Sequence, residues 1–251
     1  MKTAVVTIRK EPVYRRAAVE SGLKKLGYAI VLKTGVPKSR DDLLVLWNRK
    51  AGAEEAQAEL WERRGGTVIV MENGYLQKVD KTTYALSVHG HNGSGWFPTG
   101  TEDRFTALGF PLKEMVERKG YDLVCAQRGI GSKLMASPPR WAEKMVEKLR
   151  AQGRSTRLRA HPGNFAPKVP LLDDLKGAER CVIWSSGAGV RALVEGTPVV
   201  HAAPHWICAG WEGNRVEALQ RMAWGQWRHE EIATGLPFAM MRDAAWGPTW
   251  A

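Results

Sequence analysis

Residues 181–200 read CVIWSSGAGVRALVEGTPVV, and this stretch decides the fold. An apolar run ends in two serines and a glycine, helix-forming residues follow, and a Gly-Thr-Pro turn leads into a second apolar run. Strand, helix and strand in this order form a β-α-β unit with two parallel strands. The first turn of its helix offers unpaired backbone N–H groups and the positive end of the helix dipole, which together attract phosphate.

The polar residues of this stretch allow two interpretations. Ser185, Ser186 and Gly187 either form a phosphate-binding turn or simply cap the helix, as serines commonly do. Glu195, near the end of the same helix, either holds the hydroxyls of a ribose or is an ordinary solvated carboxylate. Spacing alone favours the capping interpretation.

The same alternation of strands and helices extends along the chain. Strands are predicted in the first part over residues 3–8, 29–32, 42–47 and 67–71, with helices over 12–26 and 51–64. A glycine-rich, helix-poor stretch follows over 88–109. Beyond it, strands are predicted over 122–127, 157–160, 181–185 and 198–202, and helices over 138–151, 171–178, 188–195, 215–227 and 228–234.

These elements predict an α/β fold of two small Rossmann-like halves, each built on a parallel sheet and facing the other across a cleft. The division between the halves is expected between Phe110 and Ser137. Ligands of open α/β sheets bind beyond the carboxyl ends of the strands, so the cleft is the expected binding site.

The composition is that of an ordinary globular protein. The chain has 251 residues, 44% of them hydrophobic and 25% charged, which excludes global disorder. No apolar run approaches the roughly 20 residues of a membrane-spanning helix, and the first residues do not read as a signal peptide. Three widely spaced cysteines argue against a disulfide framework or a zinc site, and we expect a cytoplasmic location.

The chain is strongly basic, with a net charge of +11 and a pI near 9.7. This favours a polyanionic partner, which is either nucleic acid, a phosphorylated ligand or an anionic membrane surface. Residues 148–168 contain basic but no acidic side chains. The nucleic-acid contacts predicted there are Arg150, Arg154, Arg157, Arg159 and Lys168. Arg157 and Arg159 are expected on one face of a strand, with Leu158 pointing to the core. The 11 tryptophans would offer stacking surfaces for an extruded base.

The stretch 181–200 resembles the donor-nucleotide half of GT-B glycosyltransferases, in which a small or hydroxyl residue precedes the phosphate-facing helix and Glu precedes Gly-x-Pro. Residues 160–164, Ala-His-Pro-Gly-Asn, are similar to the His-Pro strand end of capsule-type polysaccharide transferases of that fold. Segments 72–76, 92–98 and 223–232 resemble small glycosyltransferase-like proteins of phages. The resemblance covers most of the C-terminal half and patches of the N-terminal half.

The resemblance implies a domain plan and a donor. Residues 1–120 would form the acceptor half, 121–215 the donor-nucleotide half, and 216–251 closing helices that pack back on the N-terminal half. The donor substrate would be a nucleotide-diphosphate sugar, and no cofactor is expected. The donor-nucleotide residues would be Gln127, Arg128, Gly129, Gly131, His161, Ser185, Ser186, Gly187 and Glu195.

Two of these positions also have simpler interpretations. The glycine loop at 127–133 follows a strand, and Arg128 and Lys133 would neutralise a leaving diphosphate, or the loop is only a crossover. It lacks the spacing of a Walker A loop. His161 precedes a proline, which holds its backbone extended, and it either binds a base edge or phosphate or has a structural role.

The candidates for a general base lie in the glycine-rich stretch. His89 and His91 have a side chain that titrates near neutrality, and Asp103 is the rival. No third ligand accompanies the two histidines at metal spacing, and no Asp-x-Asp signature is present, so we expect no metal site and a metal-independent mechanism.

Three hypotheses for the function follow. In the first, the protein transfers a sugar to a hydroxymethylated pyrimidine base in phage-type DNA, in the cytoplasm of the host. In the second, the acceptor is a surface polysaccharide or a lipid-linked glycan. In the third, the scaffold has lost catalysis and binds nucleic acid. The positive charge serves all three, and the oligomeric state cannot be read from the sequence.

Overall fold

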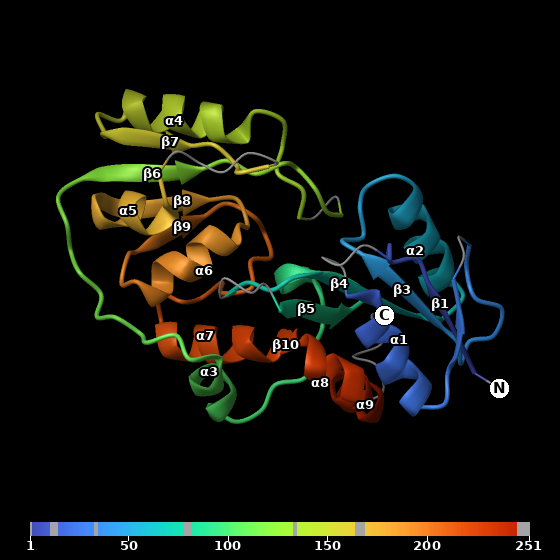
Figure 1. The fold of residues 1–251 in the computed structure, drawn as a ribbon. Coiled ribbons are helices and arrows are strands. Elements are labelled where there is room, and N and C mark those ends of the chain that lie inside the picture. Colours follow the sequence, from blue (N-terminus) through green and yellow to red (C-terminus); the bar gives the residue numbers. More distant parts are fainter. Residues whose placement is uncertain are drawn as a thin grey trace.

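The computed structural model describes residues 2–10, 15–32, 35–77, 82–132, 135–163 and 169–244. They form two α/β halves, each with its own mostly parallel sheet (Figure 1). The prediction of two Rossmann-like halves is therefore confirmed. Lys133, Asn164 and Lys168, which the sequence analysis singled out, lie outside the described residues.

The N-terminal half contains a six-stranded sheet with the order β10-β5-β4-β3-β1-β2. Its four parallel strands are β1 (Thr3–Val6), β2 (Ala29–Val31), β3 (Leu43–Trp47) and β4 (Thr67–Asn73). Helices α1 (Arg16–Lys25) and α2 (Ala53–Arg63) cover its two faces, each over its own buried cluster. Both faces are therefore apolar, as expected for a sheet that helices enclose.

The C-terminal half contains a four-stranded parallel sheet with the order β7-β6-β8-β9. The strands are β6 (Tyr121–Cys125), β7 (Thr156–Arg159), β8 (Ala178–Ile183) and β9 (Val199–His201). The helices of this half are α4 (Trp141–Ala151), α5 (Leu171–Lys176), α6 (Gly187–Val194) and α7 (Arg215–Trp224). The decisive stretch 181–200 thus forms β8, α6 and β9, as predicted.

After α7 the chain returns to the N-terminal half (Figure 1). Strand β10 (Gln226–Arg228) pairs antiparallel with β5 (Thr83–Val88), and α8 (His229–Thr234) and α9 (Leu236–Asp243) follow. Helix α8 packs on α1 so closely that a Cβ at Gly22 would lie 2.1 Å from the carbonyl oxygen of Ile232. The glycine is therefore required at this helix crossing.

Among the described residues, the sequence analysis missed β5, β10, α9, the short helix α3 (Asp103–Leu108) and the single 3-10 turn η2 (Asn92–Ser94). The helix expected over 215–227 ends at Trp224, because Gln226 to Arg228 pair with a strand far away in the sequence. The side chain of Arg104 in α3 is likewise held by residues that are distant in the sequence. Its guanidinium stacks 3.6 Å from the Trp227 ring centroid and pairs with Glu231 at 2.9 Å.

The tryptophans contribute to the cores more than to stacking surfaces. Trp61, Trp206 and Trp227 are among the largest fully buried side chains. The expectation that tryptophans present a surface to an extruded base is wrong for these three, since burial of a large aromatic ring stabilises the fold. No helix in the described ranges has the length and apolar character needed to cross a membrane.

The central strands of the C-terminal sheet depend on a buried carboxylate. Asp122 is completely buried and accepts hydrogen bonds from the guanidinium of Arg180 at 2.8 Å and from that of Arg154. Although burial raises the pKa of Asp122, the bonds from Arg180 and Arg154 lower it to a net value below its usual range. The ionised form therefore stabilises the folded protein above the pKa of the unfolded chain.

We expect Asp122→Asn to lower the free energy of unfolding by about 2 kcal/mol at neutral pH, the order of charged hydrogen bonds. The difference from the wild type should shrink as the pH falls through the low folded pKa of Asp122, because the wild-type carboxyl then also becomes neutral. Urea unfolding at several pH values measures both quantities. A pH-independent difference would contradict the assigned role of the charge.

Candidate active site

A pocket of about 230 Å³ lies between the two halves. Its walls come from the ends of β3, β4, β6, β7 and β8 and from the loop after β5. The residues that line it are Asn48, Glu72, Asn73, Gly74, Tyr75, His91, Asn92, Gln127, Arg128, Ile130, His161, Ser185, Ser186 and Gly187. The structure thus brings seven of the predicted site residues into one pocket: His91, Gln127, Arg128, His161, Ser185, Ser186 and Gly187.

The amino end of α6 forms one wall of this pocket. The Ser186 hydroxyl accepts a hydrogen bond from the Ala188 N–H at 3.1 Å and so caps the helix. Ser185 is buried, and its N–H donates to the Gln127 side chain at 2.6 Å. Ser185 and Gln127 therefore fix the end of β8, while Ser186 and Gly187 present a capped helix start to the pocket. Such a helix start attracts anions.

Two cationic or potentially cationic side chains stand beside this helix start. Arg128 is exposed, and His161 accepts a hydrogen bond at Nδ1 from the Gly163 N–H at 2.8 Å. Burial, with a smaller contribution from Arg128, lowers the pKa of His161. The imidazole is therefore neutral at neutral pH, and its proton is on Nε2, where it can be donated to a ligand oxygen.

The glycines of the crossover loop differ in their roles. A Cβ at Gly131 would lie 2.6 Å from the imidazole carbon Cε1 of His91, so only glycine allows the two halves to approach here. Gly131 also accepts a backbone hydrogen bond from Ala51 at 3.0 Å. Gly129 adopts a positive φ of 63° but does not line the pocket.

Glu72, at the end of β4, is the carboxylate of the pocket. Its Oε1 atom is shielded from solvent and has no hydrogen-bond partner in the described part of the chain. Burial raises the pKa of Glu72, although His91, Tyr75 and the Asn92 N–H favour the ionised form. The Nδ1 atom of His91 is likewise buried without a partner among the described residues. A buried carboxylate oxygen and a buried imidazole nitrogen without partners in a pocket are typical of groups that act on a ligand.

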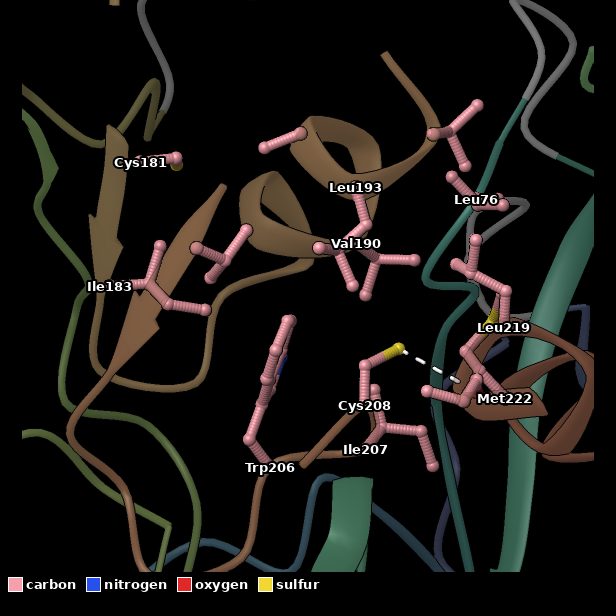
Figure 2. Close-up of a cluster of buried hydrophobic side chains, with 14 of the residues drawn as sticks. Leu76, Cys181, Ile183, Val190, Leu193, Trp206, Ile207, Cys208, Leu219 and Met222 are labelled. Carbon is pink, nitrogen blue, oxygen red and sulfur yellow. Dashed lines mark hydrogen bonds between the residues drawn. The ribbon is translucent and has the colours of Figure 1, made fainter. Parts of the chain in front are cut away.

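The segment that carries Glu72 is inserted into the other half. Leu76 is buried in the cluster of the C-terminal half that also contains Leu193 of α6 and Leu219 of α7 (Figure 2). The side chain of Gln226 accepts a hydrogen bond from the Leu76 N–H at 3.0 Å and donates one to the Leu76 carbonyl at 3.3 Å. Gln226 is itself completely buried. Glu72 is therefore held by packing that spans both halves.

A second pocket, of about 420 Å³, adjoins the first. The two share Tyr75, His161, Ser186 and Gly187. Its remaining walls are mostly apolar and come from the ends of β6 and β7, from α5 and from α6. A ligand with a charged and an uncharged part could therefore occupy both pockets, with the helix start between them.

Both predicted bases other than His91, and the predicted ribose ligand, lie outside both pockets, as do Gly129 and Gly131. His89 contacts Glu62 at 2.9 Å, beside an ion-pair network with Arg49. Asp103 is exposed at the start of α3. Glu195, at the far end of α6, forms ion pairs with Arg191 at 2.6 Å and with Lys113 at 2.5 Å. Of the three predicted bases, His91 is therefore the one that lines the pocket.

The arginines predicted to contact nucleic acid pair with other side chains of the protein. Arg150 donates to Thr156, Arg154 to Asp122 and Glu179, and both Arg157 and Arg159 pair with Asp174. Arg157 and Arg159 therefore share one face of β7, as predicted. Leu158 does not point to the core, because β7 is an edge strand and the side chain is 43% exposed. That expectation was wrong.

Comparisons with known proteins concern the fold. No protein-family model and no curated protein matches the sequence. Two solved structures share the architecture. The first is the Thermosulfurimonas dismutans KpsC β-Kdo 2,4 transferase, with a TM-score of 0.56 and 15% identity over 90% of each chain. The second is the β-Kdo 2,7 transferase of the same KpsC, with a TM-score of 0.53 and 12% identity over 95% of this chain and 99% of that one. The chain therefore shares the overall fold of these two structures.

Sequence reasoning missed several residues of the pocket. Asn48, Asn73 and Tyr75 line it, and Glu72 supplies its carboxylate. The segment 72–76 was noted for its resemblance to phage proteins, and its position directly after a predicted strand was the available signal. Within the described ranges, no group of three or more His, Cys, Asp or Glu side chains is arranged to hold a metal ion.

We expect Glu72→Gln to raise the free energy of unfolding at neutral pH. Burial raises the folded pKa of Glu72, so the ionised carboxylate destabilises the folded state above the unfolded pKa, and the neutral amide removes this effect. The gain should vanish below the ordinary glutamate range, where both side chains are neutral. Urea unfolding across pH measures it, and a loss of stability at neutral pH would show that the charge is structural.

Proposed function

We propose that the protein transfers a sugar from a nucleotide donor to an acceptor hydroxyl. One observation carries the proposal: Glu72 of the N-terminal half, whose buried Oε1 atom has no hydrogen-bond partner among the described residues, lies in the same pocket as the capped start of α6 from the C-terminal half. The helix start suits a leaving phosphate and the carboxylate suits a proton acceptor. The shared fold with two glycosyltransferases supports this pairing.

The donor would bind along the C-terminal wall. Its phosphates would meet the Gly187 N–H and the Ser186 hydroxyl, with Arg128 and the Nε2–H of His161 beside them. These groups are positioned before the reaction and are directed at the site where negative charge develops on the leaving phosphate. The apolar pocket next to Ser186 would take the nucleoside.

The acceptor would enter from the side of Glu72. The ionised carboxylate accepts the proton of the acceptor hydroxyl while the hydroxyl oxygen bonds to the anomeric carbon. The bond from this carbon to the phosphate oxygen breaks, and the phosphate leaves with the electron pair. Burial raises the pKa of Glu72 toward neutral pH, and this makes its carboxylate a stronger base. His91 lies next to the carboxylate and favours its charged form.

A saccharide is the acceptor that we place first. The two structural neighbours are named as β-Kdo 2,4 and β-Kdo 2,7 transferases. The arginines that suggested a nucleic-acid surface form intramolecular pairs with Asp122, Asp174 and Glu179. The net charge of +11 keeps a hydroxymethylated pyrimidine in DNA as the second candidate, alongside a scaffold that binds nucleic acid without catalysis.

Ser186→Ala should weaken nucleotide binding by about 1 kcal/mol, or about fivefold in Kd, because it removes one hydrogen-bond donor. Gly187→Val should weaken it further. A Cβ at this position would lie 3.3 Å from the Tyr75 carbonyl oxygen, and a branched side chain would crowd the helix start. Calorimetric titration with uridine, cytidine, guanosine and adenosine phosphates measures the affinities. Unchanged affinity in both variants would remove α6 from the donor site.

Glu72→Gln should retain nucleotide binding and lose transfer by at least about a hundredfold, the usual contribution of a general base. Glu62→Gln is the matched control, since Glu62 lies outside the pocket and pairs with Arg49 and His89. Turnover is measured as release of nucleotide from nucleotide sugars in the presence of oligosaccharide, plain DNA or hydroxymethylated DNA. Transfer to DNA alone would promote the second candidate, and full activity of Glu72→Gln would exclude the proposed base.

A further inference from the structure

Arg191 is the charged residue of α6 that lines the second pocket, whereas Glu195, after the end of the helix, does not line it. Arg191 lies four residues beyond Gly187, about 6 Å along the helix axis at 1.5 Å per residue, and lines the pocket of 420 Å³. Glu195 lies about 12 Å along the same axis and lines a different pocket, of about 270 Å³, with Lys113, Arg118 and Thr197. Of Arg191 and Glu195, only Arg191 is therefore within reach of a nucleoside bound beside the helix start.

Glu195 is engaged with other residues of the protein and lies away from the second pocket. Its Oε1 pairs with Arg191 at 2.6 Å and its Oε2 pairs with Lys113 at 2.5 Å. The carboxylate is largely buried, with 11% of its side chain exposed. A ribose diol would have to compete with two charged partners for this carboxylate.

Arg191, in contrast, is fixed and incompletely satisfied. One end of its guanidinium pairs with Glu195, and the group stands 5.3 Å from the ring centroid of Phe110. Its Nε is buried and has no hydrogen-bond acceptor among the residues that the structure describes. A buried N–H without an acceptor destabilises the folded state, so a ligand oxygen that reached this N–H would bind favourably. The held guanidinium loses little further freedom when a ligand binds.

We propose that Arg191 donates to the hydroxyls of the donor ribose and makes the site selective for ribonucleotides over deoxyribonucleotides. The inference rests on the proposed function, because it assigns the nucleoside of the donor to the second pocket. The ligand class is a ribonucleoside phosphate whose sugar presents oxygen acceptors to Arg191 while its phosphate meets Ser186 and Gly187. Glu195 and Phe110 are positioning residues that hold the guanidinium for this contact.

The test is calorimetric titration of the wild type with UDP, CMP, GDP and ADP, and with the 2′-deoxy and 3′-deoxy form of each nucleotide that binds. The wild type should prefer the ribonucleotide to at least one deoxy form by about tenfold, the order of one charged hydrogen bond. Arg191→Met should bind the ribonucleotide as weakly as that deoxy form. Arg191→Lys keeps a cation that can pair with Glu195 but lacks Nε, and it should also lose most of the discrimination.

Arg118→Met is the matched control. Arg118 lies beyond the far end of α6, where its guanidinium donates to the Thr197 hydroxyl at 3.2 Å, and this variant should discriminate like the wild type. Circular dichroism shows whether each variant is folded. Discrimination that survives in Arg191→Met or in Arg191→Lys would overturn this inference and leave the proposed function intact. A wild type that binds none of the nucleotides would overturn both.

Discussion

The side chain of Asn92 joins the two halves at the point on which the site depends. Its amide donates to the Ser185 carbonyl at 2.8 Å, and its amide oxygen accepts from the Ile207 N–H at 2.6 Å. Its own N–H donates to the Tyr75 hydroxyl at 3.0 Å. The residue is buried and adopts a positive φ of 58°, a conformation that asparagine tolerates better than most residues. One amide thus links the end of β8 with the segment that carries Glu72.

Because of this link, the pocket has a defined width without a bound ligand. Leu76 is inserted into the C-terminal core and held by Gln226, and Gly131 lies against His91. Relative movement of the halves would therefore have to break the hydrogen bonds of the Asn92 side chain to Ser185 and Ile207 and withdraw Leu76 from the C-terminal core. Charge stabilisation by positioned groups therefore suits this protein better than a site assembled by a large closure.

The sequence predicted what is encoded locally. The strand, helix and strand of residues 181–200 form where expected, because apolar periodicity and the Ser-Ser-Gly and Gly-Thr-Pro turns determine them over short range. Gln226, by contrast, lies in a strand only because β5 pairs with it, and that pairing is invisible in a local pattern. Leu76 reads as an ordinary apolar residue, and nothing local indicates that it packs in the other half.

The site residues also divide into those that a local pattern predicts and those that depend on distant parts of the chain. Ser186 and Gly187 could be placed from the helix start. The pKa of Glu72, in contrast, depends on its burial and on contacts with Tyr75, His91 and Asn92 that exist only in the folded structure. Glu195 illustrates a signal that was present but unused. Arg191 precedes it by four residues, the spacing of an ion pair on one helix face, and the structure contains that pair.

The position of a bound nucleotide shows directly whether the start of α6 forms the donor site. In a crystal structure of the protein soaked with the nucleoside phosphate that binds most tightly, we expect a phosphate oxygen within hydrogen-bond distance of the Gly187 N–H. The nucleoside should fill the pocket next to Arg191, and the phosphate should lie between it and Glu72. A nucleotide bound away from the start of α6, with the pocket between the halves empty, would show that this pocket is not the donor site.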